Sequence, residues 1–193
     1  MQAIGKTGPT TSNATPRWSP KGARRFALYF VLVAGTLLTA YYFPYDPRGL
    51  VAALFRVYLA LYTHLAGAAV SLFDPSVHVH GTHIDGKMSF ELALSCDAMD
   101  VYILFAAATV AFPATRLARA FAIGASFAAL LGINVVRIVS LYLIGVYAPQ
   151  RFEFFHMQLW PLAIVLVAAT GFLAWARTAR PVCERPLDAS VQG

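Results

Sequence analysis

Five long apolar stretches divide the chain, and short clusters of Pro, Gly and charged residues separate them. The stretches cover residues 26–43, 50–73, 98–112, 120–147 and 156–176. A bilayer-spanning helix needs about 20 mostly apolar residues, so the pattern favours an all-α, polytopic membrane helical bundle. It divides the chain into a disordered lead at 1–25, a membrane domain at 26–177 and a short tail at 178–193.

The basic residues decide the expected topology. Nine of them flank the ends assigned to one side of the membrane: Arg17, Lys21, Arg24, Arg25, Arg116, Arg119, Arg177, Arg180 and Arg185. The opposite loops hold only Arg48, Lys87 and Arg151. The positive-inside rule therefore places both termini in the cytoplasm, which requires an even number of spans. Stretch 50–73 contains Arg56 and His64, so we expect it to be an outer interfacial helix beside four spans.

Composition supports the same class. The 193 residues are 59% hydrophobic and 12% charged, which excludes an ordinary soluble globule and a disordered chain. The net charge of +6 lies in the segments that flank apolar runs, so we expect contact with the lipid bilayer and no nucleic-acid partner. The two cysteines, Cys96 and Cys183, stand far apart, and a disulfide framework is not expected.

The polar stretch between residues 74 and 96 has strand-like alternation around Asp85-Gly86, which predicts a small extracytoplasmic hairpin. His78, His80 and His83 lie within it, and alternate strand residues share a face, so a zinc site is one interpretation. No thiolate lies in the segment, and solvated hairpin histidines are the favoured alternative. We expect no metal and no cofactor.

Three chemically costly residues fall at one expected depth in the membrane. Cys96 opens the second span at its outer end, and His156 opens the fourth. Arg137 lies within the third span, where a charge costs about 2.5–3.5 kcal/mol or more. At 1.5 Å per residue it stands about 26 Å above Ala120, near the outer boundary of a core roughly 30 Å thick. The topology therefore predicts that these three residues converge.

Such a set suits nucleophilic catalysis. Helix N-termini and nearby cations favour the thiolate form of cysteine, histidine transfers protons, and arginine stabilises an oxyanion. Asn134 shares the helix face of Arg137 and is a supporting residue that orients Arg137 or the substrate. Asp97 either caps the following helix or orients His156. Each main residue also has a structural alternative: a buried inert cysteine, a snorkelling arginine and an interfacial histidine.

The residues resemble the exosortase/archaeosortase family, nearest to its short class H members. The resemblance covers residues 26–177 and rests on these motifs: Ser95-Cys96, Phe112-Pro113-Ala114, Asn134-Val135-Val136-Arg137-Ile138, Phe152-Glu153-Phe154-Phe155-His156 and Leu159-Trp160-Pro161. The family usually has Gly two positions after the cysteine, whereas this chain has Ala98.

The resemblance implies a cysteine protease or transpeptidase of the bacterial plasma membrane, with its site on the extracytoplasmic side. Cys96 would be the nucleophile, His156 the general base and Arg137 the oxyanion-side residue. Substrates would be C-terminal sorting signals of exported proteins, transferred to an acceptor nucleophile that the sequence does not identify. Two alternatives remain: a catalytically silent scaffold of the same fold, and a metal-handling membrane protein that uses the three histidines.

Overall fold

The computed structural model describes residues 20–93 and 96–179. Its helices are α1 (Pro20–Tyr42), α2 (Leu50–Ser71), α3 (Met99–Ala111), α4 (Arg116–Tyr147) and α6 (Trp160–Thr178), with three short turns before α6: η2 (Pro149–Arg151), α5 (Phe152–Phe154) and the π-helical η3 (Phe155–Leu159). A small antiparallel sheet contains β1 (His78–His80), β2 (His83–Asp85) and β3 (Phe90–Glu91). The predicted mostly helical bundle with a small sheet is confirmed.

Four helical segments are long and apolar enough to cross a membrane: α1, α2, α4 and the continuous run Pro149–Thr178. This is the number of spans that the sequence predicts. The chain is therefore a multi-pass membrane protein.

The structure exchanges the predicted roles of α2 and α3, because α2 is long enough to span the membrane and α3 is not. Helix α2 has 22 residues and the composition of a span, whereas α3 has 13 residues, about 20 Å of helix against a core of roughly 30 Å. The sequence predicts an interfacial helix at α2 because the stretch contains Arg56 and His64. In the structure the Arg56 guanidinium donates to the Pro47 main-chain oxygen at 2.7 Å, so its hydrogen bond is made to the turn before the helix.

The N-terminal boundary is also different. Helix α1 begins at Pro20, so residues 20–25 form its first turns and are not part of a disordered lead. Proline is tolerated in the first helical turn, and Lys and Arg are good helix formers. Residues 1–19 and 180–193, which include Cys183, lie outside the described part of the chain.

The sheet has one strand more than the predicted hairpin. A two-residue turn at Gly81-Thr82 joins β1 to β2, and Gly81 takes a φ of +61° there. Positive φ at a turn position is accessible to glycine at no steric cost. Asp85-Gly86, the predicted turn, instead ends β2 and starts the connection to β3.

The sheet packs on α2 and α4 through a shared apolar core. Buried side chains from all three parts meet there: Tyr62, Ala66, Val70, Ile84, Leu92, Ile138 and Tyr142. A Cβ on Gly67 of α2 would overlap the Val79 side chain, so glycine permits the close approach of β1. Tyr142 of α4 also donates a hydrogen bond of 2.5 Å to Asp74 and accepts one of 3.0 Å from the Lys87 main chain. These bonds tie both sheet connections to α4.

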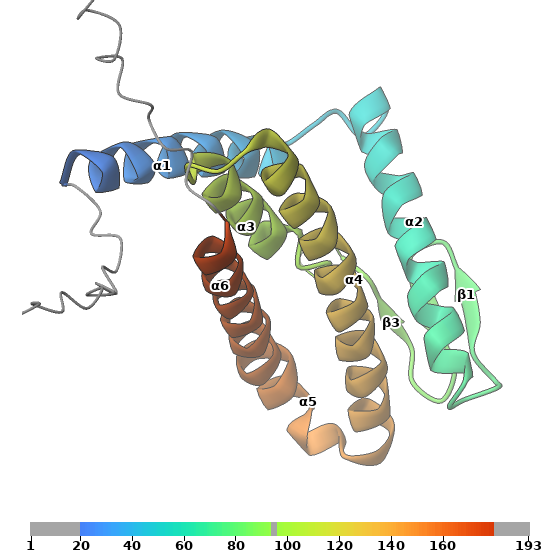
Figure 1. Ribbon diagram of the computed structural model, residues 1–193. Coiled ribbons are helices and arrows are strands. Elements are labelled where there is room, and N and C mark those ends of the chain that lie inside the picture. The colour runs from blue at the N-terminus through green and yellow to red at the C-terminus, as the bar shows by residue number, and fades with distance from the viewer. Residues whose placement is uncertain (1–19, 94–95, 180–193) are drawn as a thin grey trace, which may run out of the picture.

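Helices α2 and α4 border this core, and α1, α3, α4 and α6 form a second set of contacts. Figure 1 shows the sheet beside α2 and α4, with α6 on the other side of α4 and α1 across the top of the picture. Helix α1 packs on α3, which in turn contacts α4 and α6. Thr115 caps α4 by accepting a hydrogen bond of 3.3 Å from the Ala118 main chain.

Candidate active site

A cavity of about 210 Å³ lies between β3, the segment before α3, α4 and the turns before α6. Cys96, Arg137 and His156 all line it. The structure therefore brings together the three residues that the sequence predicts to converge. The remaining lining residues are Phe90, Glu91, Leu92, Ile138, Leu141, Tyr142 and Phe152.

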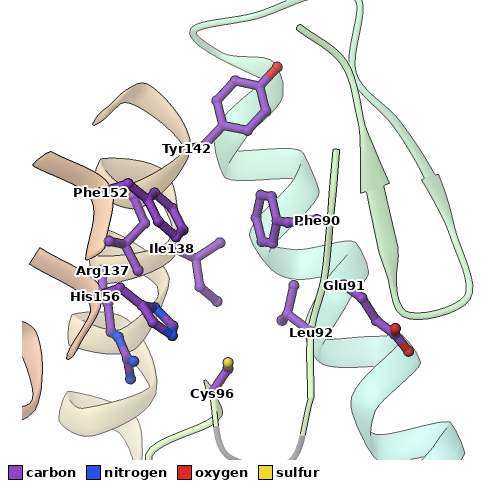
Figure 2. A pocket seen from close by; sticks show the side chains of 10 residues that line it. Phe90, Glu91, Leu92, Cys96, Arg137, Ile138, Tyr142, Phe152 and His156 are labelled. Carbon is purple, nitrogen blue, oxygen red and sulfur yellow. The ribbon is translucent and has the colours of Figure 1, made fainter. Parts of the chain in front are cut away.

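The close view of this cavity shows how the polar side chains are directed. In Figure 2 the Cys96 sulfur points into the space between β3 and α4, and the His156 ring reaches into it from the opposite wall. The Arg137 guanidinium lies beside the His156 ring, on the same wall. The cavity thus holds a nucleophilic group, a titratable base and a fixed cation.

Main-chain hydrogen bonds hold Cys96 in place. Its N–H donates to the Ala93 oxygen at 2.9 Å. The Asn134 side-chain amide donates to the Cys96 oxygen at 2.8 Å and to the Tyr62 hydroxyl at 2.5 Å. Asn134 is fully buried, so it anchors the cysteine to both α2 and α4. Its supporting role is to position Cys96, rather than to orient Arg137.

Arg137 is an unusual residue for its place because it is charged and only 6% exposed. Among the described residues, no carboxylate lies within 4.0 Å of its guanidinium. A buried cation without a counter-ion is costly, and such residues in membrane segments commonly serve a site. The side chain is therefore available to a negatively charged or carbonyl oxygen in the cavity.

His156 lies in the π-helical turn η3, which interrupts an otherwise α-helical run. Single π-turns widen a helix locally and are frequent at functional sites. The imidazole stacks on Phe152, with ring centroids 5.6 Å apart and planes 10° from parallel. Its Nδ1 is buried and has no hydrogen-bond partner within the described segments. Aromatic stacking, and not a carboxylate, therefore orients this ring.

Asp97 follows the cysteine but its side chain is directed elsewhere. One carboxylate oxygen accepts from the Met99 main chain at 2.9 Å and the other from the Tyr41 hydroxyl at 2.8 Å. Tyr58 is a further partner. Asp97 therefore satisfies the first main-chain N–H of α3, although the N-cap position itself is Ala98, and its side chain is not directed to His156. Burial raises the pKa of Asp97 above its ordinary value, although these hydrogen bonds oppose the shift.

Ala98, the last residue before α3, is left-handed, with a φ of +57°. Apart from glycines, it is the only residue with positive φ in the described part of the chain. This conformation costs an L-residue about 1–2 kcal/mol relative to glycine. It separates Cys96 and Asp97 from the helix, so the cysteine does not itself occupy the helix N-terminus that the sequence analysis assigned to it.

The histidines of the sheet do not meet at a metal site. His78 and His80 are exposed on β1, and His83 on β2 lies 3.9 Å from Glu91. In residues 20–93 and 96–179, no group of three or more His, Cys, Asp or Glu side chains could hold a metal ion. The zinc interpretation therefore has no geometric support in this part of the chain.

Several residues of the site were not identified from the sequence. Tyr62 and Phe152 support Asn134 and His156, while Phe90 and Leu92 form the opposite wall. In sequence they are ordinary apolar or aromatic positions. Only Phe152 carried a signal, because it stands one helical turn before His156.

Comparisons with protein-family models, curated proteins and solved structures found no match to this chain.

Proposed function

We propose that this chain is a membrane-embedded cysteine protease or transpeptidase that cleaves C-terminal sorting signals of exported proteins. The observation that carries the proposal is the single cavity lined by Cys96, Arg137 and His156. The three residues come from three separate segments. Packing alone does not explain why a buried cation without a carboxylate partner in the described segments lies beside a thiol and an imidazole. The resemblance to the exosortase/archaeosortase family implies the same three residues as the catalytic set.

In the first step His156 accepts the Cys96 proton, and the thiolate attacks the scissile carbonyl carbon. The Arg137 guanidinium stabilises the negative oxygen of the tetrahedral intermediate through charge-assisted hydrogen bonds. Collapse of the intermediate breaks the C–N bond. His156 returns the proton to the leaving amine, and a thioester on Cys96 remains.

In the second step an acceptor nucleophile attacks the thioester and releases the new acyl product. His156 takes the proton of the acceptor, and the thiol is regenerated when that proton returns to sulfur. Water as the acceptor makes the protein a protease, and a surface molecule makes it a transpeptidase. We place the site on the extracytoplasmic side of a bacterial plasma membrane, because the positive-inside rule assigns the start of α4 to the cytoplasm.

The first test is the processing of a co-expressed, C-terminally tagged sorting-signal protein by wild type, Cys96→Ala and Cys183→Ala. Cys183→Ala is the matched control, since it makes the same change at the other cysteine of the chain. We expect cleavage by wild type and by the control and none by Cys96→Ala. Equal processing by all three would exclude the Cys96 mechanism and favour a catalytically silent scaffold of the same fold.

A second test needs no substrate. The rate at which iodoacetamide alkylates Cys96 in the purified Cys183→Ala protein reports the thiolate fraction. We expect His156→Gln and Arg137→Gln each to slow this reaction at neutral pH, while Arg151→Gln, at the end of η2, leaves it unchanged. Rates that are the same in all variants would show that the imidazole and the guanidinium do not activate the thiol.

A further inference from the structure

We propose that the outer edge of β3 binds the substrate as an additional strand, so that an extended peptide pairs with the main chain of Glu91 and passes Cys96. The inference rests on the proposed function and adds to it the conformation in which the substrate is recognised. Its starting point is the hydrogen-bonding register of the small sheet.

The register leaves the main chain of Glu91 without a partner in the sheet. The strand order is β1-β2-β3, so β3 has a free edge among the described residues. His83 faces Glu91 and Ile84 faces Phe90 across β2 and β3, and the Leu92 N–H donates to the Thr82 oxygen at 2.9 Å. In an antiparallel pair, hydrogen-bonded and non-hydrogen-bonded positions alternate. Glu91 is therefore a non-hydrogen-bonded position, and its N–H and C=O face away from β2.

Glu91, whose main chain has no hydrogen-bond partner across the sheet among the described residues, also lines the candidate active site. Glu91 lines the cavity, yet Figure 2 shows its carboxylate pointing away from it. The part of Glu91 that borders the cavity is thus its main chain. The side chains of Phe90 and Leu92, which flank it, point into the cavity and would contact alternate residues of a paired peptide.

The edge strand leads directly to the nucleophile. Ala93, two residues after the end of β3, accepts the Cys96 N–H through its main-chain oxygen at 2.9 Å. Because Glu91 and Cys96 line the same cavity, we place a peptide that continues the ladder from Glu91 next to the Cys96 sulfur. The anchor of the sheet on α4 through Tyr142 keeps this edge at a fixed place relative to Arg137.

The chemistry of the cavity favours a peptide as the molecule that pairs with the edge of β3. Arg137 is buried, has no carboxylate partner in the described segments and faces the cavity, so it complements a carbonyl oxygen or an oxyanion. A helical substrate would keep its carbonyl oxygens in its own hydrogen bonds. An extended segment presents both the scissile carbonyl to Cys96 and free main-chain groups to Glu91, which is the β-augmentation mode of recognition.

The first experiment separates the main chain of Glu91 from its side chain. Glu91→Pro removes the free N–H, and proline is tolerated on an edge strand where that group makes no ladder bond. Glu91→Ala keeps the N–H and removes only the outward carboxylate. With the tagged sorting-signal protein, we expect processing by Glu91→Pro to be about tenfold or more below that of Glu91→Ala.

Cys96 alkylation in the same variants checks that the site is intact, and we expect wild-type rates in both. Processing by Glu91→Pro at the wild-type level would overturn the proposal. So would an equal loss in Glu91→Ala, because the side chain would then carry the effect.

A second experiment keeps the proposal testable if Glu91→Pro does not fold. A single cysteine is placed at successive positions of the substrate segment and is cross-linked to Phe90→Cys in a Cys96→Ala, Cys183→Ala background. Glu91→Cys, whose side chain points away from the cavity, is the matched control. Strand pairing predicts that cross-linking to Phe90→Cys rises and falls with every second residue.

A period of three to four residues would show a helical substrate and overturn the proposal, as would the absence of any cross-link above the Glu91→Cys control. Failure of the proposed function has a different signature, namely processing that survives Cys96→Ala. The two inferences can therefore fail separately.

Discussion

Asn134 is the residue through which the fold most directly controls the candidate nucleophile. Its side-chain amide donates to the Cys96 main-chain oxygen at 2.8 Å and to the Tyr62 hydroxyl at 2.5 Å, and it is 0% exposed. Asn134→Ala deletes both bonds. A net contribution of about 1–1.5 kcal/mol per hydrogen bond gives an expected loss of about 2–3 kcal/mol in the free energy of unfolding.

Two smaller effects act in opposite directions. The Asn134 side-chain oxygen is buried without a hydrogen-bond partner among the described residues, so its removal relieves a desolvation cost. The space that the side chain leaves adds a cavity cost of similar size. The expected loss in the free energy of unfolding for Asn134→Ala therefore stays at about 2–3 kcal/mol.

Tyr62→Phe is the matched control because it deletes one of the two bonds and keeps the ring. We expect it to cost about 1–1.5 kcal/mol, and the double variant to cost no more than Asn134→Ala alone, within about 0.5 kcal/mol. The assay is equilibrium unfolding of the purified protein in mixed detergent micelles, together with the rate of Cys96 alkylation. Only Asn134→Ala should alter that rate strongly.

Additive costs in the double variant would refute the shared hydrogen bond. A loss below about 0.5 kcal/mol for Asn134→Ala, with an unchanged alkylation rate, would refute the conclusion that this residue anchors Cys96.

Three further predictions concern the frame of the site. Hydrogen bonds, first from Tyr142 and then from Ser76, hold the pKa of Asp74 well below its usual range. This carboxylate therefore stabilises the fold above about pH 4, and the contribution is lost as the pH falls through the lowered pKa. The free energy of unfolding measured from pH 2 to 6 should depend less on acid in Tyr142→Phe than in wild type, and identical profiles would contradict this. Because Ala98 has positive φ, the free energy of unfolding of Ala98→Val should be about 1–2 kcal/mol lower than that of Ala98→Gly. Equal stability of the two variants in the same assay would count against backbone strain at this position. Gly67→Ala should cost about 1–3 kcal/mol because its Cβ would overlap the side chain of β1, whereas Gly35→Ala, which meets nothing within 4 Å, should cost nothing; equal thermal stability of the two would show that the sheet yields.

The features that follow from local chemistry could be predicted. Apolar runs of about 20 residues identify membrane helices because the bilayer penalises every unpaired main-chain group. The convergence of Arg137 and His156 followed from counting helical rise along two stretches that are long enough to span, whereas Cys96 lines the same cavity although the stretch after it is not. Periodicity and length require no knowledge of how the helices pack.

The features that depend on packing could not be predicted. Arg56 made α2 look interfacial because a charge inside an apolar run is costly, but its hydrogen bond to the Pro47 oxygen satisfies it at the helix start. The apolar stretch 98–112 was expected to span although it has only 15 residues, because its hydropathy alone does not show that it stays within the bundle. The left-handed Ala98, which delays the start of α3 until Met99, has no local signature.

The chain sequence determines that this is a helical membrane protein, and it predicts that a thiol, an imidazole and a guanidinium lie at a similar depth. Hydropathy and helical rise are properties of single segments, and they set depth along the membrane normal. They do not set the rotation of a helix or the register of a strand. The anchoring of Cys96 by Asn134 and Tyr62, the stacking of His156 on Phe152 and the free main chain of Glu91 all arise from contacts between segments far apart in the chain. Those contacts exist only once the core between α2, α4 and the sheet has formed, because its packing selects one rotation and one register.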